Sequence, residues 1–157
     1  MSSESLDDLR KKLALEAQAH QAAVDAVDAA AAAYLQVNRT DLRCLEILTQ
    51  NDSVLPSQLA SQLGLTTGSV TAMLDRLERL GYVTRSADPA DRRKVVVRIT
   101  PKATRKAGKI YGPIALEGER DVLSRYSAAE LRLLFDYHRR SRELQERHAA
   151  RIRQLEN

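Results

Sequence analysis

The chain has 157 residues, of which 43% are hydrophobic and 29% charged, and this balance is typical of one globular domain. Its single cysteine excludes a disulfide framework, and its three histidines lie too far apart in sequence to ligate a metal from one helix. The net charge is a modest +4, and neither a signal peptide nor an apolar run of membrane length is recognisable. We therefore expect a cytoplasmic protein that has no membrane partner, no metal and no cofactor.

The first predicted element is a long helix over residues 4–37, in which apolar residues recur at helical spacing from Leu6 to Leu35. Residues 29–33 are an unbroken alanine run, which favours helix and lets another backbone approach closely. We therefore assign residues 1–37 to an N-terminal dimerisation helix. The alternative is an alanine-rich helix that packs only within its own subunit.

Residues 38–106 are expected to form a winged helix-turn-helix region. Residues 38–41 cap a short helix, and a second short helix begins with a proline and ends at Gly64, where a helix terminus favours positive φ. The next helix, over about residues 67–80, carries apolar residues at helical spacing. Two β-rich runs around a polar turn then predict a wing over about residues 82–100.

Positive charge is concentrated in the same part of the chain. Residues 66–106 hold ten Lys and Arg against four Asp and Glu, a net charge of +6, whereas residues 1–65 have a net charge of −4. A basic segment that coincides with a helix and a hairpin is typical of a protein that binds double-stranded DNA, because a helix fits the major groove and its N-terminal N–H groups favour phosphate. The alternative for this helix is a merely amphipathic surface helix.

Three stretches give a more specific signal: LTTGSVTAMLDRLERLGYV at 65–83, DPADRR at 88–93 and VVVRIT at 95–100. In this order they closely resemble the MarR family of bacterial transcriptional regulators. The resemblance implies a mainly α-helical homodimer with a small β-hairpin wing, whose recognition helices and wings bind a pseudo-palindromic operator. It also implies a repressor that a small aromatic or lipophilic ligand releases from DNA.

The predicted DNA-binding residues lie on the recognition helix and in the wing: Thr66, Thr67, Ser69, Thr71, Arg76, Arg92, Arg93 and Lys94. The family often has a long polar or basic residue at the position of Ala72, so base readout is expected to rest on Ser69, Thr71 and Arg76. The family's Asp-x-Arg wing element matches residues 91–93. The resemblance implies that Arg93 enters the minor groove or pairs with Asp75, so Asp75 and Asp91 are predicted to support the wing.

The last predicted elements are helices over residues 107–157, which we assign to dimerisation. A kink is expected near Gly112-Pro113, and Ser127 with Glu130 forms a capping box that opens a helix running to about Leu155. The middle of this final helix is too polar for a core of its own. It therefore requires a partner, for which the N-terminal helix of the other subunit is the obvious candidate.

Other candidate sites are weaker. The resemblance implies a ligand cleft near the kink, with Tyr34 and Tyr111 as candidate lining residues, although core or interface positions are the favoured alternative for both tyrosines. Some relatives sense peroxides through a cysteine of the first helix, but Cys44 lies on the second, where a small buried hydrophobe is the simpler interpretation. No nucleophile–base set or phosphate-binding glycine loop is recognisable, so we do not expect an enzyme.

The sequence therefore predicts a homodimeric, sequence-specific transcriptional regulator. Two alternatives stay open: a sequence-tolerant architectural DNA binder, and a winged-helix module that docks other proteins.

Overall fold

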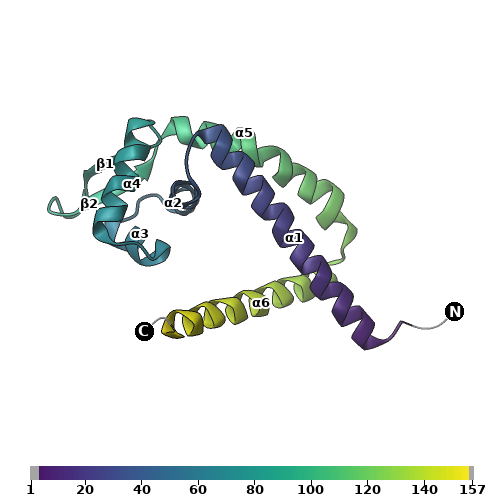
Figure 1. Ribbon diagram of the computed structural model, residues 1–157. Helices are drawn as coiled ribbons and strands as arrows, with labels where there is room; N and C mark the ends of the chain where they lie inside the picture. The colour runs from purple at the N-terminus through teal and green to yellow at the C-terminus, as the bar shows by residue number, and fades with distance from the viewer. Residues whose placement is uncertain (1–3, 156–157) are drawn as a thin grey trace. The chain divides into compact units, whose positions relative to one another are not determined.

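The computed structural model describes residues 4–155. The chain divides into two compact units, the first ending at Ile110 and the second beginning at Tyr111. The first unit contains helices α1 to α4, the hairpin β1–β2 and the beginning of α5 (Figure 1). Within the described residues, no helix is both long enough and apolar enough to cross a membrane.

Helix α1 (Leu6–Leu35) confirms the predicted N-terminal helix. The Ser5 hydroxyl caps its start by accepting a hydrogen bond from the Asp8 N–H, and the helix ends at Gln36, whose φ is 58°. Its buried residues, Ala31 and Leu35, both lie in the last part of the helix. The apolar residues nearer the N-terminus are exposed, so packing within the first unit covers only one end of α1.

The next three helices form the centre of the first unit: α2 (Arg39–Thr49), α3 (Pro56–Leu63) and α4 (Thr67–Arg79). Their bounds agree with the predicted ones to within one or two residues because the terminal signals are strong. Gly64 and Gly81 adopt φ of 65° and 72°, a region that favours glycine. The Asn38 and Thr66 side chains cap α2 and α4 by accepting backbone N–H groups.

The core of this unit is built mainly from apolar side chains of α2, α3, α4 and both strands, and buried residues of α1 and α5 add to it. Its largest side chains that are fully buried, each less than 2% exposed, are Leu48, Leu59, Met73, Leu74, Leu77, Val70, Val83, Val97 and Cys44. Each large apolar side chain of this kind contributes roughly 1.5–3 kcal/mol when it is buried. The face of α4 that holds the helix on the domain is thus fixed, and its opposite face is exposed.

Strands β1 (Val83–Ala87) and β2 (Val95–Ile99) pair antiparallel, with Val83 opposite Ile99 at the base and Ala87 opposite Val95 towards the tip. Val54 forms an additional bridge to Val97, which ties the hairpin to the segment before α3. Val83, Val96 and Val97 are buried against the domain, whereas Ala87 and Val95 at the last pair before the turn are exposed, so the predicted wing is confirmed.

Tyr82 joins several elements of the first unit just after α4. Its side chain is only 3% exposed, and its hydroxyl donates to the Leu35 carbonyl, at 3.0 Å, at the end of α1. The Lys106 ammonium of α5 (Pro101–Glu117) donates to the same hydroxyl at 2.9 Å. The end of α1, the base of the wing and the start of α5 are therefore connected through one buried phenol.

The second unit contains the end of α5, a π-helical turn η1 (Gly118–Val122), a short 3₁₀ turn η2 (Leu123–Arg125) and α6 (Ala128–Leu155). Helix α5 continues through Pro113, so the departure from α-helical geometry comes later than the expected kink near Gly112-Pro113. The predicted capping box is confirmed, since the Glu130 carboxylate accepts from the Ser127 N–H at 2.8 Å and the Ser127 hydroxyl accepts from the Glu130 N–H. No described residue of α6 is buried.

Candidate nucleic-acid interface

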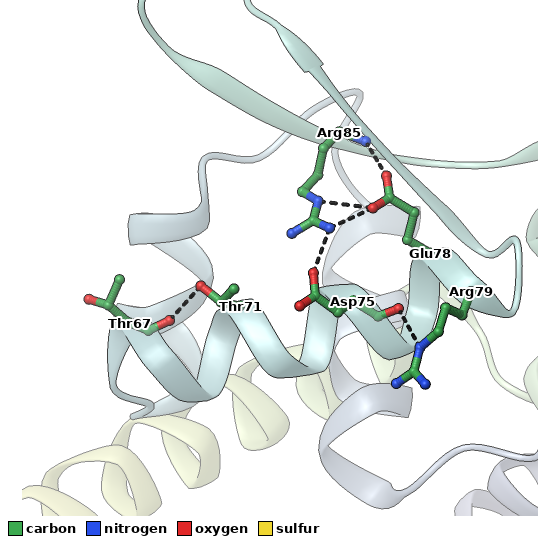
Figure 2. A network of polar contacts seen from close by, with 6 residues as sticks. All are labelled: Thr67, Thr71, Asp75, Glu78, Arg79 and Arg85. Atoms are coloured by element: carbon green, nitrogen blue, oxygen red, sulfur yellow. Dashed lines mark hydrogen bonds and ion pairs between the residues drawn. The ribbon is translucent and has the colours of Figure 1, made fainter.

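The N-terminal end of α4 presents small polar side chains to solvent. Thr66, Thr67, Ser69 and Thr71 are all exposed, as expected for residues that would approach DNA. The Thr66 and Ser69 hydroxyls lie 2.9 Å apart, and Thr71 donates to the Thr67 carbonyl at 3.0 Å (Figure 2). These contacts fix the hydroxyls close to the helix, where their remaining lone pairs can accept from a base edge.

The wing carries exposed cations at its tip. Arg92, Arg93 and Lys94 are exposed, and the Arg93 side chain is 93% accessible. Asp91 organises this turn, because its carboxylate accepts from the Arg93 N–H at 3.2 Å while its carbonyl accepts from the Lys94 N–H at 2.9 Å. The structural support expected of Asp91 is therefore local to the turn, and it leaves the three cations at the surface.

Asp75 has a different partner from the expected one. The expected pair with Arg93 is not formed; Arg85 of β1 instead places its Nη2 2.6 Å from Oδ1 of Asp75. The same guanidinium donates to Glu78 through Nε at 3.1 Å, and Glu78 also accepts the Arg85 N–H at 3.3 Å (Figure 2). Arg85 also lowers the pKa of Glu78, which keeps that carboxylate charged.

The reason for this difference is the position of each arginine along the hairpin. Arg93 belongs to the exposed turn, whereas Arg85 lies in β1 two residues after the buried Val83 and so on the same face of the strand. That face points towards α4. Because side chains alternate along a strand, the apolar Val83 indicates that Arg85 lies on the face that packs on the domain. This signal was not used in the prediction from sequence.

Arg76, which was predicted to contact DNA, pairs with a carboxylate of another helix. Its guanidinium donates to the Asp41 carboxylate of α2, through Nη2 at 2.7 Å and through Nε at 3.3 Å. The Asp41 side chain is buried and the Arg76 side chain is 40% exposed. Arg76 therefore has an ion-pair partner within the protein, whereas Thr66, Ser69 and Thr71 are exposed.

The remaining candidate residues lie elsewhere. Tyr34 belongs to the first unit, where it is 53% exposed with the Lys106 ammonium 5.4 Å from its ring centre; Tyr111 is half-buried and belongs to the second unit.

Cys44 is completely buried, and burial, with Asp41 nearby, raises the pKa of its thiol to about 12. This favours a buried hydrophobe over a reactive thiolate. Within residues 4–155, no cluster of three or more His, Cys, Asp or Glu could hold a metal.

Comparisons with known proteins agree with this geometry. Residues 37–95 match the model of the MarR family. The chain is 35% identical over 125 residues to YcgE of Bacillus subtilis, an uncharacterized HTH-type transcriptional regulator, with 80% of each chain covered.

Solved structures show the same fold. YusO of Bacillus subtilis superposes with a TM-score of 0.60 at 22% identity, over 90% of this chain and 99% of YusO. A mutant of MarR from E. coli, solved in complex with operator DNA, superposes with a TM-score of 0.55 at 20% identity, over 88% of this chain and 99% of that one. The predicted winged-helix fold is confirmed.

Proposed function

Because the chain belongs to the MarR family of DNA-binding transcriptional regulators, which are not enzymes, we propose that it is a homodimeric repressor that binds a pseudo-palindromic operator and dissociates when a small aromatic or lipophilic ligand binds. Such a protein acts on the chromosome, in the cytoplasm. The finer parts of this proposal are supported by separate observations.

The observation that carries the operator proposal is the pairing of an exposed helix terminus with a cationic wing. The start of α4 offers backbone N–H groups and hydroxyls, and the turn beyond β1 offers Arg92, Arg93 and Lys94. A helix in the major groove reads base edges, whereas exposed cations bind phosphates or enter a narrow minor groove. The groups that both modes of contact require therefore lie within one unit.

Homodimerisation is supported by apolar side chains that stand exposed on both terminal helices. Monomeric soluble proteins seldom leave many large apolar side chains in contact with water along one element. On α1 and α6 the exposed fractions of such side chains range from 36% to 85%. They include Leu6, Leu9, Leu13, Leu133, Phe135, Leu144, Ile152 and Leu155. We propose that a second copy covers these side chains.

The operator proposal is tested by selecting duplexes from random-sequence DNA and measuring their affinity by gel shift. A two-fold symmetric dimer should select paired half-sites about 10 base pairs apart. Inserting five base pairs between them turns one half-site to the opposite face and should abolish tight binding. Equal affinity for random duplexes would favour the architectural alternative, and no DNA binding would favour the protein-docking alternative.

Ligand release is supported by the family and by the aromatic side chain of Tyr34 beside the Lys106 ammonium. A ligand can release DNA only if it has a higher affinity for the DNA-incompetent conformation than for the DNA-competent one. For a useful switch the difference in binding free energy is about 1–3 kcal/mol. Thermal-shift screening of phenols and aromatic acids tests this part. If no compound stabilises the protein or weakens its DNA binding, regulation by a ligand is wrong.

A further inference from the structure

Asp41 is an unusual residue in this fold because it is a buried carboxylate. Among the described residues it is the charged side chain that is buried, with 2% exposure. It occupies the first turn of α2, where its N–H donates to the Asn38 side chain at 2.8 Å and its Oδ2 accepts from the Asn38 N–H at 3.5 Å. A buried charge is costly unless it is paired and hydrogen-bonded.

Arg76 supplies that pairing from the recognition helix. Two of its nitrogens reach two different carboxylate oxygens, Nη2 to Oδ1 at 2.7 Å and Nε to Oδ2 at 3.3 Å. This two-point geometry fixes direction as well as distance, which a single point charge cannot do. The hydrogen bond to Asp41 also raises the pKa of Arg76, so the guanidinium stays charged.

The pair holds one flank of α4, and Arg85 holds another. Residues of a helix are separated by about 100° around its axis, so Arg76 lies on a different side from Glu78, with Asp75 between the two positions on the outer face. Asp75 and Glu78 are held by Arg85 of the wing. The recognition helix is therefore connected to α2 on one flank and to β1 on the other.

From this geometry we propose that Arg76 is a positioning residue for DNA binding and not a base-reading one. Resting on the proposed operator binding, this assigns sequence readout to the hydroxyl-bearing residues at the start of α4. The Arg76 charge is balanced by Asp41 in both the free and the bound protein. Arg76 therefore releases few counterions from DNA, in contrast to an exposed arginine of the wing.

The two roles predict opposite results for Asp41→Asn. If Arg76 reads a base, removing the carboxylate frees its guanidinium and removes a negative charge, so DNA binding should strengthen. If Arg76 positions the helix, the same substitution loosens α4 and binding should weaken. Asn is close to isosteric with Asp and can still accept from the Asn38 N–H, so the start of α2 is retained.

The experiment uses full-length protein and a duplex that the unmodified protein selects from random-sequence DNA. Affinities are measured as a function of salt for Asp41→Asn, Arg76→Gln, Arg76→Lys and the double variant D41N/R76Q, on the selected duplex and on its single-base-pair variants. Arg92→Gln is the matched control, since it also removes one arginine charge but from an exposed position. Circular dichroism confirms that each variant is folded at the temperature of the assay.

We expect Asp41→Asn and Arg76→Gln each to weaken binding about tenfold on every duplex, and the double variant to be no weaker than the worse single variant. Arg76→Lys, which keeps the charge, should recover part of the loss. The slope of log affinity against log salt concentration should be unchanged in these variants. Arg92→Gln, in contrast, should make that slope less steep by about one per subunit.

Three results would overturn the inference: tighter binding by Asp41→Asn, a change of preference at a single base pair in Arg76→Gln, or unchanged affinity in both folded variants. If the unmodified protein selects no duplex at all, the proposed function fails instead. The two failures are therefore distinguishable.

Discussion

The substitution Arg93→Gln tests most directly whether the wing binds the DNA backbone. The Arg93 side chain is 93% exposed, and its ion pair with Asp91 spans 3.4 Å at a solvated turn. An exposed pair of this kind is worth little in water. Arg93 is therefore free to approach a phosphate or a narrow minor groove, and binding there would release a counterion.

The magnitude follows from one such contact in each subunit of a dimer. Each neutralised phosphate contributes about −0.9 to the slope of log affinity against log salt, so two lost contacts make the slope about 1.8 less steep. Over a fourfold rise in salt, from about 50 to about 200 mM, the affinity of the unmodified protein should fall roughly 12-fold further than that of the variant.

Fluorescence anisotropy titrations of the selected duplex over this salt range provide the measurement. Arg10→Gln is a suitable control because it removes an exposed arginine of α1, far from the wing in sequence. The control should keep the slope of the unmodified protein. An Arg93→Gln slope equal to that of the control would refute the proposed contact between the wing and the DNA backbone.

Three further predictions concern the helix–wing contact, the core and the buried thiol. Asp75→Ala should weaken operator binding in gel shifts although it removes a negative charge, because Arg85 then loses one of its two carboxylates on α4; tighter binding would show that Asp75 is a simple repulsive charge. Leu77→Ala, at a site with 0% exposure, should lower the free energy of unfolding by about 2–5 kcal/mol in urea titrations, and a loss below about 1 kcal/mol would contradict the packing described for α4. Because burial raises the pKa of Cys44 from 9.0 to about 12, its contribution to stability should be complete below pH 9 and should be lost progressively as the pH rises towards 12. Cys44→Ser should remove that part of the pH dependence, and rapid reaction of the folded protein with a thiol reagent at pH 8 would contradict the burial.

The sequence predicted the elements well because their ends are determined locally. Gly64 and Gly81 supply the positive φ at which two helices end, and Asn38, Thr66 and Ser127 supply caps whose hydrogen bonds involve residues only three positions away. Such signals act within one turn of helix and depend little on the rest of the fold. They therefore give helix bounds but not tertiary pairs.

The partners of the arginines could not be read in the same way. Arg76 pairs with Asp41, 35 positions earlier, and Arg85 reaches Asp75 across ten positions. Helical spacing places Arg76 and Asp75 on the surface of α4, but it does not indicate which distant carboxylate or guanidinium comes near. Several arginines in the wing were chemically suitable, and only the burial of Val83 distinguishes the strand face that carries Arg85.

Tyr82 connects the C-terminal end of α1 to the base of the wing, so a tilt of α1 about that end would be felt beside the wing. Its hydroxyl donates to the Leu35 carbonyl at one end of a helix of 30 residues. At 1.5 Å per residue this helix is about 45 Å long, so a tilt of about 5° at Leu35 would displace the far end by roughly 4 Å. Conversely, a shift of several ångströms at the far end would become a rotation of only a few degrees beside the wing. The length of α1 thus converts a large displacement at its N-terminal end into a small rotation at Leu35.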